Sequence, residues 1–389
     1  RLMSLQHVAD NDILVQVNRT RVSTGSTVLA VCEDPVRVVF WVAASASPIG
    51  SLVLMELRGS ELVVVAEWDG FPRQTVVSSI QGRLVATSWF APEPRTWSPL
   101  AKVEAVELTK AGSCHRSALC ILASFPYALH ILDVAPTASG KVLLVTSGTP
   151  LGYLWNPETG DFVGLESSRL EFGVKSMIGL SSGDTLCAVS REYGYLELYS
   201  SANADLALPV VAQLATLPSH LAGLPLSGEL SSDGGTVMLA GEIASSTGES
   251  EFRVLAAALP RRIECLAASI ERPFWLSPST ALKPEEQLQP TMPTDDALRI
   301  YPQEFPRAIV SATEKSLAGK PVALAVTANM GLCVYQLATS EGLRIEKWTG
   351  TEFQSYVHRS SDVFSSLRFS QSGCALVAIA SGHCTLWNT

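Results

Sequence analysis

The sequence predicts an all-β fold built from repeated four-stranded antiparallel units. Three observations carry this prediction. A glycine-containing turn between two apolar strands recurs along the chain, short strand-like runs alternate with Gly and Pro, and helical 3.6-residue periodicity is scarce. A chain of 389 residues with seven such units predicts a seven-bladed β-propeller.

The two ends of the chain predict how the ring closes. Near the N-terminus, residues 13–17 form a strand-like run with no hairpin partner ahead of them. The C-terminal segment 364–389 contains three predicted strands and no fourth. The first strand holds Leu367 and Phe369 and is followed by a turn from Ser370 to Gly373. The second strand runs from Ala375 to Ile379, and a Ser381–Gly382 turn leads to the third, which holds Leu386–Asn388. We expect residues 13–17 to pair as the outer strand of this last blade, since closure removes exposed sheet edges.

The repeat is anchored by a turn of the Ser/Ala-x-Gly kind. It recurs at Gly140, Gly183, Gly234, Gly319 and Gly373. In four units an aromatic residue ends the next-but-one strand, 15, 16, 16 and 14 residues after the glycine, at Trp155, Tyr199, Tyr335 and Trp387. The glycines are 43, 51, 85 and 54 residues apart, so the step of 85 predicts an insertion of about 35 residues or a hidden blade.

Two weaker units precede these, at 26–69 and 73–124. The predicted blades, all within one domain spanning 1–389, are 26–69, 73–124, 127–170, 174–217, 226–269, 306–349 and 364–389 plus 13–17, with 270–305 as a loop insertion. Second strands such as Lys141–Val145 and Thr236–Ala240 are nearly continuous apolar runs. Both faces of such strands must be covered, which neighbouring blades would provide.

The pattern resembles the WD-repeat β-propeller family over essentially the whole chain. Leu154-Trp155-Asn156 and Leu386-Trp387-Asn388 stand where that family ends its third strand with Trp-Asp, and Leu198-Tyr199-Ser200 and Val334-Tyr335-Gln336 take the same position elsewhere. The family's Gly-His pair before the first strand is absent, because Gly382-His383 falls in a different turn. The resemblance implies the propeller fold, with the family's hydrogen-bonded His/Asp network missing or replaced.

Composition narrows the class of partner and the compartment. The net charge is −9 and the basic pair Arg261-Arg262 is isolated, so no direct nucleic-acid partner is expected. No apolar run is long enough to span a bilayer. The eight cysteines are dispersed without a C-x-x-C pair, as in reduced intracellular proteins of the cytoplasm or nucleus. A first residue of Arg rather than Met suggests a fragment, a processed chain or an incomplete start, and Asn18-Arg19-Thr20 is a chance glycosylation triplet.

The long loops predict a binding face. In a four-stranded meander the first-to-second and third-to-fourth turns share one face of the disc, and the second-to-third and blade-to-blade loops share the other. First-to-second turns are short throughout, whereas segments 91–100, 245–251 and 270–305 are long and are assigned to the other face. We expect other protein subunits to bind there, because long loops without periodicity in compact domains are usually functional or disordered.

The loops also supply candidate anchors. Segment 270–305 holds six prolines, the aromatic pair Phe274-Trp275 and the acidic pair Glu285-Glu286, and Trp97 lies in a proline-rich loop. The proposed partner-binding residues are Trp97, Phe274, Trp275, Glu285 and Glu286. The alternatives are that the aromatic side chains pack back on their own blades and that the insertion is unstructured.

The motifs of catalysis and metal binding are weak. Segment Gly179–Gly183 matches G-x-S-x-G, but a strand follows Ser181 where a hydrolase needs a helix. Cys114, His115 and Cys120 are three soft ligands, whereas structural zinc takes four. No catalytic residue, cofactor or metal is therefore predicted.

The innermost strands bring few charges to the central channel. They are Asp133, Lys175, Glu229 and Arg368, a mixture that suits neutralising pairs better than a calcium cage. The sequence therefore predicts a non-catalytic interaction platform within a multi-subunit intracellular assembly. Two alternatives stay open, namely a hydrolase- or lactonase-like propeller enzyme that uses the channel, and a reader of peptides or modified residues at the channel mouth.

Overall fold

A computed structural model gives the structure of this chain, and all of the described residues lie in strands or in the connections between them. The described residues are 13–43, 49–73, 75–80, 83–90, 101–108, 114–115, 119–122, 131–136, 142–146, 152–155, 162–165, 174–180, 185–190, 196–200, 225–233, 235–244, 250–258, 312–338 and 342–389. Within these ranges no helix occurs, and so none could span a membrane.

The described strands form seven antiparallel sheets. Blade 1 holds β2 (Thr27–Cys32), β3 (Arg37–Ala43), β4 (Ile49–Arg58) and β5 (Glu61–Pro72). Blade 2 holds β6 (Val76–Ile80), β7 (Arg83–Phe90), β8 (Ala101–Leu108), β9 (Cys114–His115) and β10 (Leu119–Leu122). Blade 3 holds β11 (Ile131–Pro136), β12 (Val142–Thr146), β13 (Gly152–Trp155) and β14 (Phe162–Leu165). Blade 4 holds β15 (Val174–Leu180), β16 (Thr185–Ser190) and β17 (Leu196–Ser200).

The remaining three blades occupy the C-terminal half. Blade 5 holds β18 (Pro225–Leu230), β19 (Thr236–Ala244), β20 (Ser250–Ala258) and β21 (Thr313–Ser316). Blade 6 holds β22 (Pro321–Thr327), β23 (Leu332–Leu337), β24 (Leu343–Trp348) and β25 (Phe353–His358). Blade 7 holds β26 (Phe364–Phe369), β27 (Ala375–Ala380), β28 (His383–Asn388) and, from the N-terminal end, β1 (Val15–Arg21).

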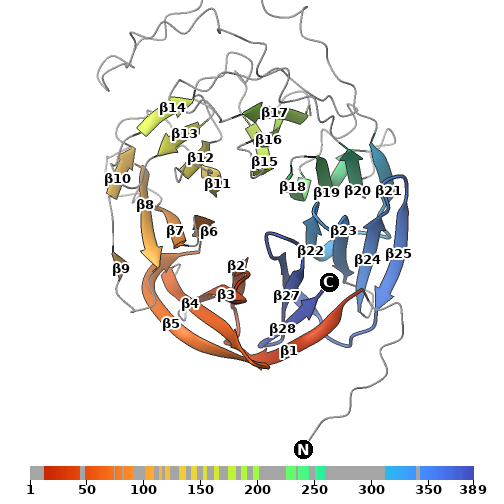
Figure 1. Cartoon of the computed structure of the whole chain (residues 1–389), viewed down its shortest axis with the longest axis horizontal. Coiled ribbons are helices and arrows are strands. Elements are labelled where there is room, and N and C mark those ends of the chain that lie inside the picture. Colours follow the sequence, from red (N-terminus) through yellow and green to blue (C-terminus); the bar gives the residue numbers. More distant parts are fainter. Residues whose placement is uncertain are drawn as a thin grey trace, which may run out of the picture.

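The blades are arranged in a ring around a central opening (Figure 1). The first strand of each blade lies innermost and contacts the first strands of both neighbouring blades, in the closed order β2, β6, β11, β15, β18, β22, β26 and back to β2. Strands such as β5, β25 and β1 lie at the rim. The fold is thus all-β, with four-stranded antiparallel blades set radially.

The ring closes where the two ends of the chain share one sheet. Strand β1 pairs antiparallel with β28, from Val15 opposite Asn388 to Arg21 opposite His383, and so it is the outer strand of blade 7. The expected segment 13–17 lies two to four residues ahead of the observed strand, but the pairing partner is the expected one. The buried Asn18 side chain donates from Nδ2 to the Ser60 carbonyl of blade 1, which ties the closing strand to the next blade. An amide engaged in this way is a poor glycosylation acceptor.

The second strands whose side chains the structure describes most fully, β3, β19, β23 and β27, are largely buried on both faces. Along β27 the side chains alternate between two apolar clusters, with Leu376 and Ala378 packed toward blade 6 and Val377 and Ile379 toward blade 1. Blades 5 and 6 share a cluster of the same kind around Cys333 and Tyr335. Blades 1 and 2 share a separate apolar cluster. The period of two along a pleated strand therefore places every apolar residue in one inter-blade core or the other.

The recurring Ser-x-x-Gly turn has a physical basis in blades 5 and 7. The buried Ser231 and Ser370 hydroxyls accept hydrogen bonds from the amides of Thr236 and Ala375, at 2.9 and 3.0 Å, and so close each first-to-second hairpin. Gly373 has φ near +80°, and a Cβ there would lie 2.3 Å from Thr327 Oγ1 of blade 6. The glycine is needed for both its backbone angle and its close approach to the neighbouring blade.

The structure differs from the sequence prediction at the junction of blades 5 and 6. The fourth strand of blade 5 is β21 and lies outside the expected range 226–269, while blade 6 runs from β22 to β25 instead of 306–349. Gly319 therefore lies between blades, and Tyr335 lies in a second strand rather than a third. The error arose because β21, with sequence Thr-Glu-Lys-Ser, is a short polar rim strand without an apolar signature.

This correction changes where the insertion leaves the disc. Strand β20 ends at Ala258, opposite Thr236, which follows the first-to-second turn of blade 5. We call the edge that carries first-to-second and third-to-fourth connections the turn face, and the opposite edge the joining face. Segment 270–305 belongs to the third-to-fourth connection between β20 and β21 and so departs from the turn face. The loops after β7 and β19, which include 91–100 and 245–249, depart from the joining face, so the three long loops do not share one face as expected.

Two smaller differences concern blades 2 and 4. Blade 2 gains the two-residue strand β9, which pairs with β8. Blade 4 has three described strands, and the expected fourth falls outside the described residues. Trp155 and Trp387 lie in the third strands β13 and β28, as the spacing predicts.

Removing the closing strand tests how much the ring depends on it. Deletion of residues 1–21 should lower the free energy of unfolding by on the order of 3 kcal/mol or more, because it exposes the β28 edge and removes apolar side chains from two inter-blade clusters. Arg19→Ala, which removes an exposed ion pair with Asp362, is the matched control and should cost less than about 1 kcal/mol. Urea unfolding would contradict the closure if both variants matched the parent chain.

Candidate interaction surface

The turn face is held together by polar contacts between successive blades. In the blade 5 turn, the Ser232 amide donates to Asn329 Oδ1 of blade 6 at 2.8 Å. Asn329 Nδ2 donates in turn to the Gln371 carbonyl of blade 7 at 2.7 Å. The next residue, Ser372, donates from its hydroxyl to the Glu33 carboxylate of blade 1. These contacts link the first-to-second turns of four consecutive blades, so the part of the turn face on blades 5, 6, 7 and 1 is a continuous surface.

Glu229 lies beneath this surface on β18, an innermost strand. Its Oε2 accepts a 2.8 Å hydrogen bond from the Ala328 amide, at the end of β22 in the neighbouring blade. Burial raises the pKa of Glu229 to about 7, while this hydrogen bond and the positive charge of Arg368 act in the opposite direction. Glu229 is thus a partly buried carboxylate that titrates near neutral pH.

Of the other three charged residues expected at the channel, the structure describes the side chain of Arg368 alone. Arg368 is exposed on β26 and its charge acts on Glu229 across blade 6, as in a neutralising pair. The backbones of Asp133 and Lys175 lie on β11 and β15, also innermost strands, but their side chains fall outside the described part of the structure. Within the described residues no group of three or more His, Cys, Asp or Glu side chains could hold a metal ion.

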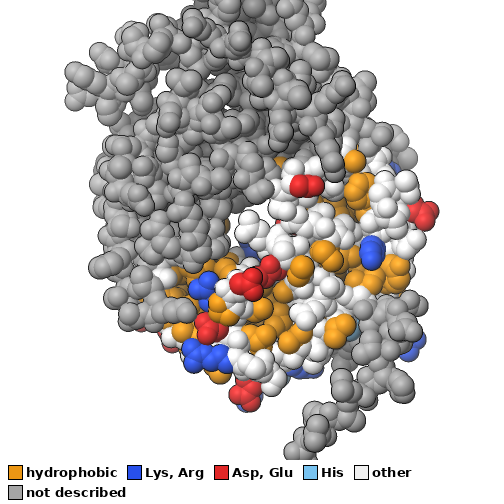
Figure 2. Space-filling model, viewed as in Figure 1, with side chains coloured by type: hydrophobic (Ala, Val, Ile, Leu, Met, Phe, Trp, Pro, Cys, Tyr) orange, Lys and Arg blue, Asp and Glu red, His pale blue; other side chains and the backbone are white. Residues whose placement is uncertain are grey.

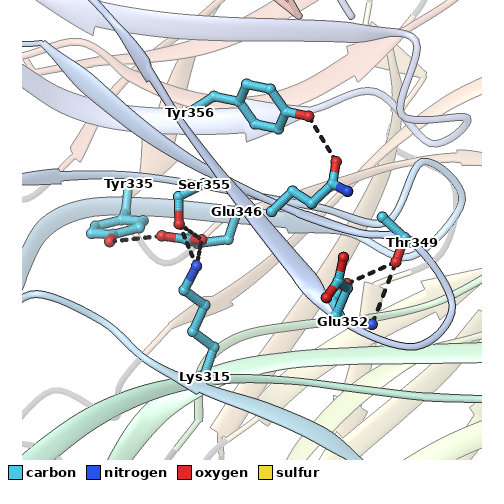
Figure 3. Close-up of polar contacts among 8 residues, drawn as sticks. Lys315, Tyr335, Glu346, Thr349, Glu352, Ser355 and Tyr356 are labelled. Atoms are coloured by element: carbon cyan, nitrogen blue, oxygen red, sulfur yellow. Dashed lines mark hydrogen bonds and ion pairs between the residues drawn. The ribbon is translucent and has the colours of Figure 1, made fainter.

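A buried carboxylate joins blades 5 and 6 at the rim (Figure 3). Glu346 on β24 is 4% exposed, and its Oε2 lies 2.7 Å from Lys315 Nζ of β21. Ser355 donates to the same oxygen at 2.7 Å, and Tyr335 donates to Oε1 at 3.3 Å. Burial, with a smaller contribution from Glu346, raises the pKa of Tyr335 to about 12, which keeps its hydroxyl a donor at neutral pH.

This cluster fixes the strand that follows the insertion. Strand β21 makes only four backbone pairs with β20, and its remaining contacts are side-chain ones. Arg253 of β20 bonds Glu314 at 3.0 Å, while Lys315 reaches across to blade 6. The chain is therefore clamped on both sides immediately after it returns from the connection that contains 270–305.

The residues proposed as partner anchors lie outside the described residues. This applies to Trp97, Phe274, Trp275, Glu285 and Glu286, and also to Ser181 of the G-x-S-x-G match. The sequence analysis missed Asn329, Lys315 and Glu346. The Asn329-Met330-Gly331 turn was a usable signal for the first, whereas nothing local marks the pairing of Lys315 with Glu346 across blades.

The register of blade 2 bears on the three soft ligands near Cys114. Cys114 pairs opposite Leu108 and Cys120 opposite Val103, both on β8. Five residues along a strand separate these positions by roughly 16 Å, too far for two ligands of one zinc ion. The backbone therefore agrees with free thiols.

The surface shows no large area of one charge in the view of Figure 2. On the described part, hydrophobic side chains alternate with separate acidic and basic groups around the central opening.

Glu229 gives a pH-dependent prediction. Its raised pKa means that the folded protein holds this proton more tightly than the unfolded chain, so stability falls as pH rises from 4.5 to 7 and is level beyond those limits. Over this pH range the free energy of unfolding of the parent chain should fall by roughly 1–3 kcal/mol relative to that of Glu229→Gln. Urea unfolding at several pH values measures it, with exposed Glu352→Gln as control, and a constant difference between the parent and Glu229→Gln would refute it.

The rim cluster gives a second prediction. Lys315→Met leaves the buried Glu346 carboxylate without its cation and should cost about 1–3 kcal/mol. Arg58→Ala removes an exposed pair with Glu56 and should cost at most about 1 kcal/mol. Equal losses of stability on thermal unfolding would show that the cluster contributes no more than a surface ion pair.

Comparison with known proteins gives matches in structure but not in sequence. No family model and no curated protein matches the chain. The β-propeller domain of Cps50 (Swd1) from Myceliophteria thermophila is similar with a TM-score of 0.55 and 11% identity, over 95% of this chain and 99% of that chain. A chain in the crystal structure of the mitotic checkpoint complex gives 0.54 and 8%, over 100% and 97%.

A third structure is an enzyme. Virginiamycin B lyase from Staphylococcus aureus has a TM-score of 0.50 at 8% identity, over 95% of this chain and 98% of that chain. The three alignments each span nearly the full length of both chains, so the likeness covers the whole ring. By its fold, the chain is a β-propeller.

Proposed function

We propose that this protein is a non-catalytic protein–protein interaction platform within a multi-subunit intracellular assembly. The observation that carries the proposal is the polar chain from Ser232 through Asn329 and Gln371 to the Ser372–Glu33 contact. It joins the turns of four blades into one surface, and a surface that is already ordered loses little conformational entropy on binding.

The structural neighbours support a role in assemblies. One of them is a chain in the crystal structure of the mitotic checkpoint complex. Their likeness to this chain is one of fold, so the partners themselves are not carried over. A shared shape with several edges for contact is compatible with the same general use.

The corrected topology divides the proposed anchors between two faces. Trp97 belongs to a connection of the joining face, whereas Phe274, Trp275, Glu285 and Glu286 belong to the connection that departs from the turn face. We therefore propose two partner surfaces, one on each face, in place of the single face expected from the sequence. The clamp at Lys315 supports this role, because it holds the end of the β20–β21 connection on the disc while a partner binds.

A channel enzyme is the second candidate. In its favour are the Glu229 carboxylate, with a pKa of about 7, and the lyase among the neighbours. However, Glu229 already accepts the Ala328 amide and lies within the influence of Arg368, which is the arrangement of a structural link between blades. A peptide reader at the same channel mouth would meet the same occupied carboxylate.

Two tryptophan variants test the platform. Trp97→Ala and Trp275→Ala, made separately, should each weaken association with the co-purified partner of their own face by ~2 kcal/mol, since exposed tryptophans in restrained loops bury large areas. Val64→Ala, at a rim residue 60% exposed on β5, is the control and should leave affinity unchanged. Unaltered affinity in both tryptophan variants, measured by surface plasmon resonance with folding verified, would remove both residues as anchors.

A further inference from the structure

Among its described residues, the joining face of blades 6 and 7 has a charge opposite to that of the whole chain. Its described residues, at the ends of the strands and in the connections 19–26, 319–323, 342–344, 356–364 and 380–384, include five cations but one carboxylate, Asp362. The cations are Arg19, Arg21, Lys320, Arg344 and Arg359. In a protein of net charge −9, this local excess of positive charge is a distinct surface feature.

Contacts in the structure join β1, β23 and the connection before β26 on this surface. Arg19 Nη2 lies 3.1 Å from Asp362 Oδ1, and the Asp362 carbonyl accepts Gln336 Nε2 at 2.8 Å. Gln336 Oε1 accepts the Phe364 amide at 2.6 Å, so the connection before β26 is held firmly in place. Arg21 follows Arg19 by two residues on β1 and lies on the same side of that strand.

Apolar side chains accompany the cations. Val357 is 58% exposed and lies opposite Arg344 in the β24–β25 register, and Val363 is 66% exposed beside Asp362. We define the joining patch as Arg19, Arg21, Arg344, Val357, Arg359 and Val363. Exposed valines between cations form a surface that is unfavourably hydrated. A partner with both acidic and apolar side chains could cover it.

Several of the cations have no partner carboxylate among the described residues. Arg21 and Arg359 are exposed and form no ion pair with any other residue in the described part of the chain. Arg344 has a buried Nε that finds no acceptor among the described residues. Only Arg19 is paired, by Asp362, so a partner that brings carboxylates would satisfy donors that the disc itself leaves open.

We propose that the joining patch binds an acidic protein segment in which Asp or Glu residues alternate with apolar side chains. The proposal rests on the proposed function as an interaction platform and specifies the chemistry of one partner. Carboxylates would pair with Arg21, Arg344 and Arg359, while apolar side chains would cover Val357 and Val363. Lipid headgroups and nucleic acid would use the same cations, but they offer nothing to the two valines.

A peptide assay tests the proposal with the purified full-length chain. The probe is a fluorescein-labelled peptide that alternates Glu pairs with Leu and Phe, and its binding is followed by fluorescence anisotropy. The parent chain should bind it, more weakly as salt increases, and Arg21→Glu/Arg359→Glu should weaken binding by about tenfold or more. The control reverses two cations of the turn face, Arg58→Glu/Lys347→Glu, and should bind like the parent.

Further arms decide the kind of partner. A peptide with Ser in place of Leu and Phe should bind the parent chain more weakly than the original peptide does. The variant Val363→Ser should bind the original peptide more weakly than the parent chain does. The inference is overturned if the two double variants bind alike, if the Ser peptide binds as well as the apolar one, or if phosphatidylserine vesicles or single-stranded RNA bind more tightly than the peptide. Folding of each variant is verified by thermal unfolding, and Val363→Ser provides the test should the double reversal not fold.

The assay separates this inference from the platform proposal. If native partners still co-purify with Arg21→Glu/Arg359→Glu while the peptide result is negative, the platform stands and the joining patch is not its acidic-segment site. If no partner co-purifies with the parent chain, the platform proposal fails irrespective of peptide binding.

Discussion

The pairing of β1 with β28 is the constraint on which the rest of the structure depends. Each blade covers its second strand on both faces only if it has a neighbour on each side, and a ring supplies two neighbours to every blade. Without the N-terminal segment, blade 7 would lack its outer strand and blade 1 would lose its contact with the buried Asn18. Because the closing contact joins residues more than 360 positions apart, blade 7 is completed only when both ends of the chain are present.

Polar contacts between neighbouring blades show how the blades are kept in register. Between blades 5 and 6 the link is Lys315 to Glu346, and on the turn face it is Ser232 to Asn329. Trp387, at the end of the third strand of blade 7, packs edge-on against Phe364 and His358, and its Nε1 has no acceptor among the described residues. The contribution of this tryptophan is therefore apolar, while the polar links between blades come from other residues.

Much of the fold could be predicted because strand alternation and Ser-x-x-Gly turns are local signals. The β26–β27 turn and the two-sided β27 follow directly from residues 370–380, and the closing strand follows from an unpaired run near residue 15. Strand β21 could not be found in this way, since a short, polar rim strand is defined by its partner β20 and not by its own side chains. The same holds for the interaction surfaces, because the contacts of Asn329 and Lys315 depend on the packing of neighbouring blades and that of Arg19 depends on the closure of the ring.

The position of β21 also bears on how this chain could change during evolution. The residues on either side of the long connection are held as neighbours, with Ala256 opposite Thr313. Their pairing therefore does not depend on the length of the chain between them. The entropic cost of closing a loop grows only with the logarithm of its length, by about 0.6 kcal/mol for each doubling. The gap between β20 and β21 is thus a natural grafting point, at which a new binding segment or even a whole domain could be acquired while the disc that carries it stays the same.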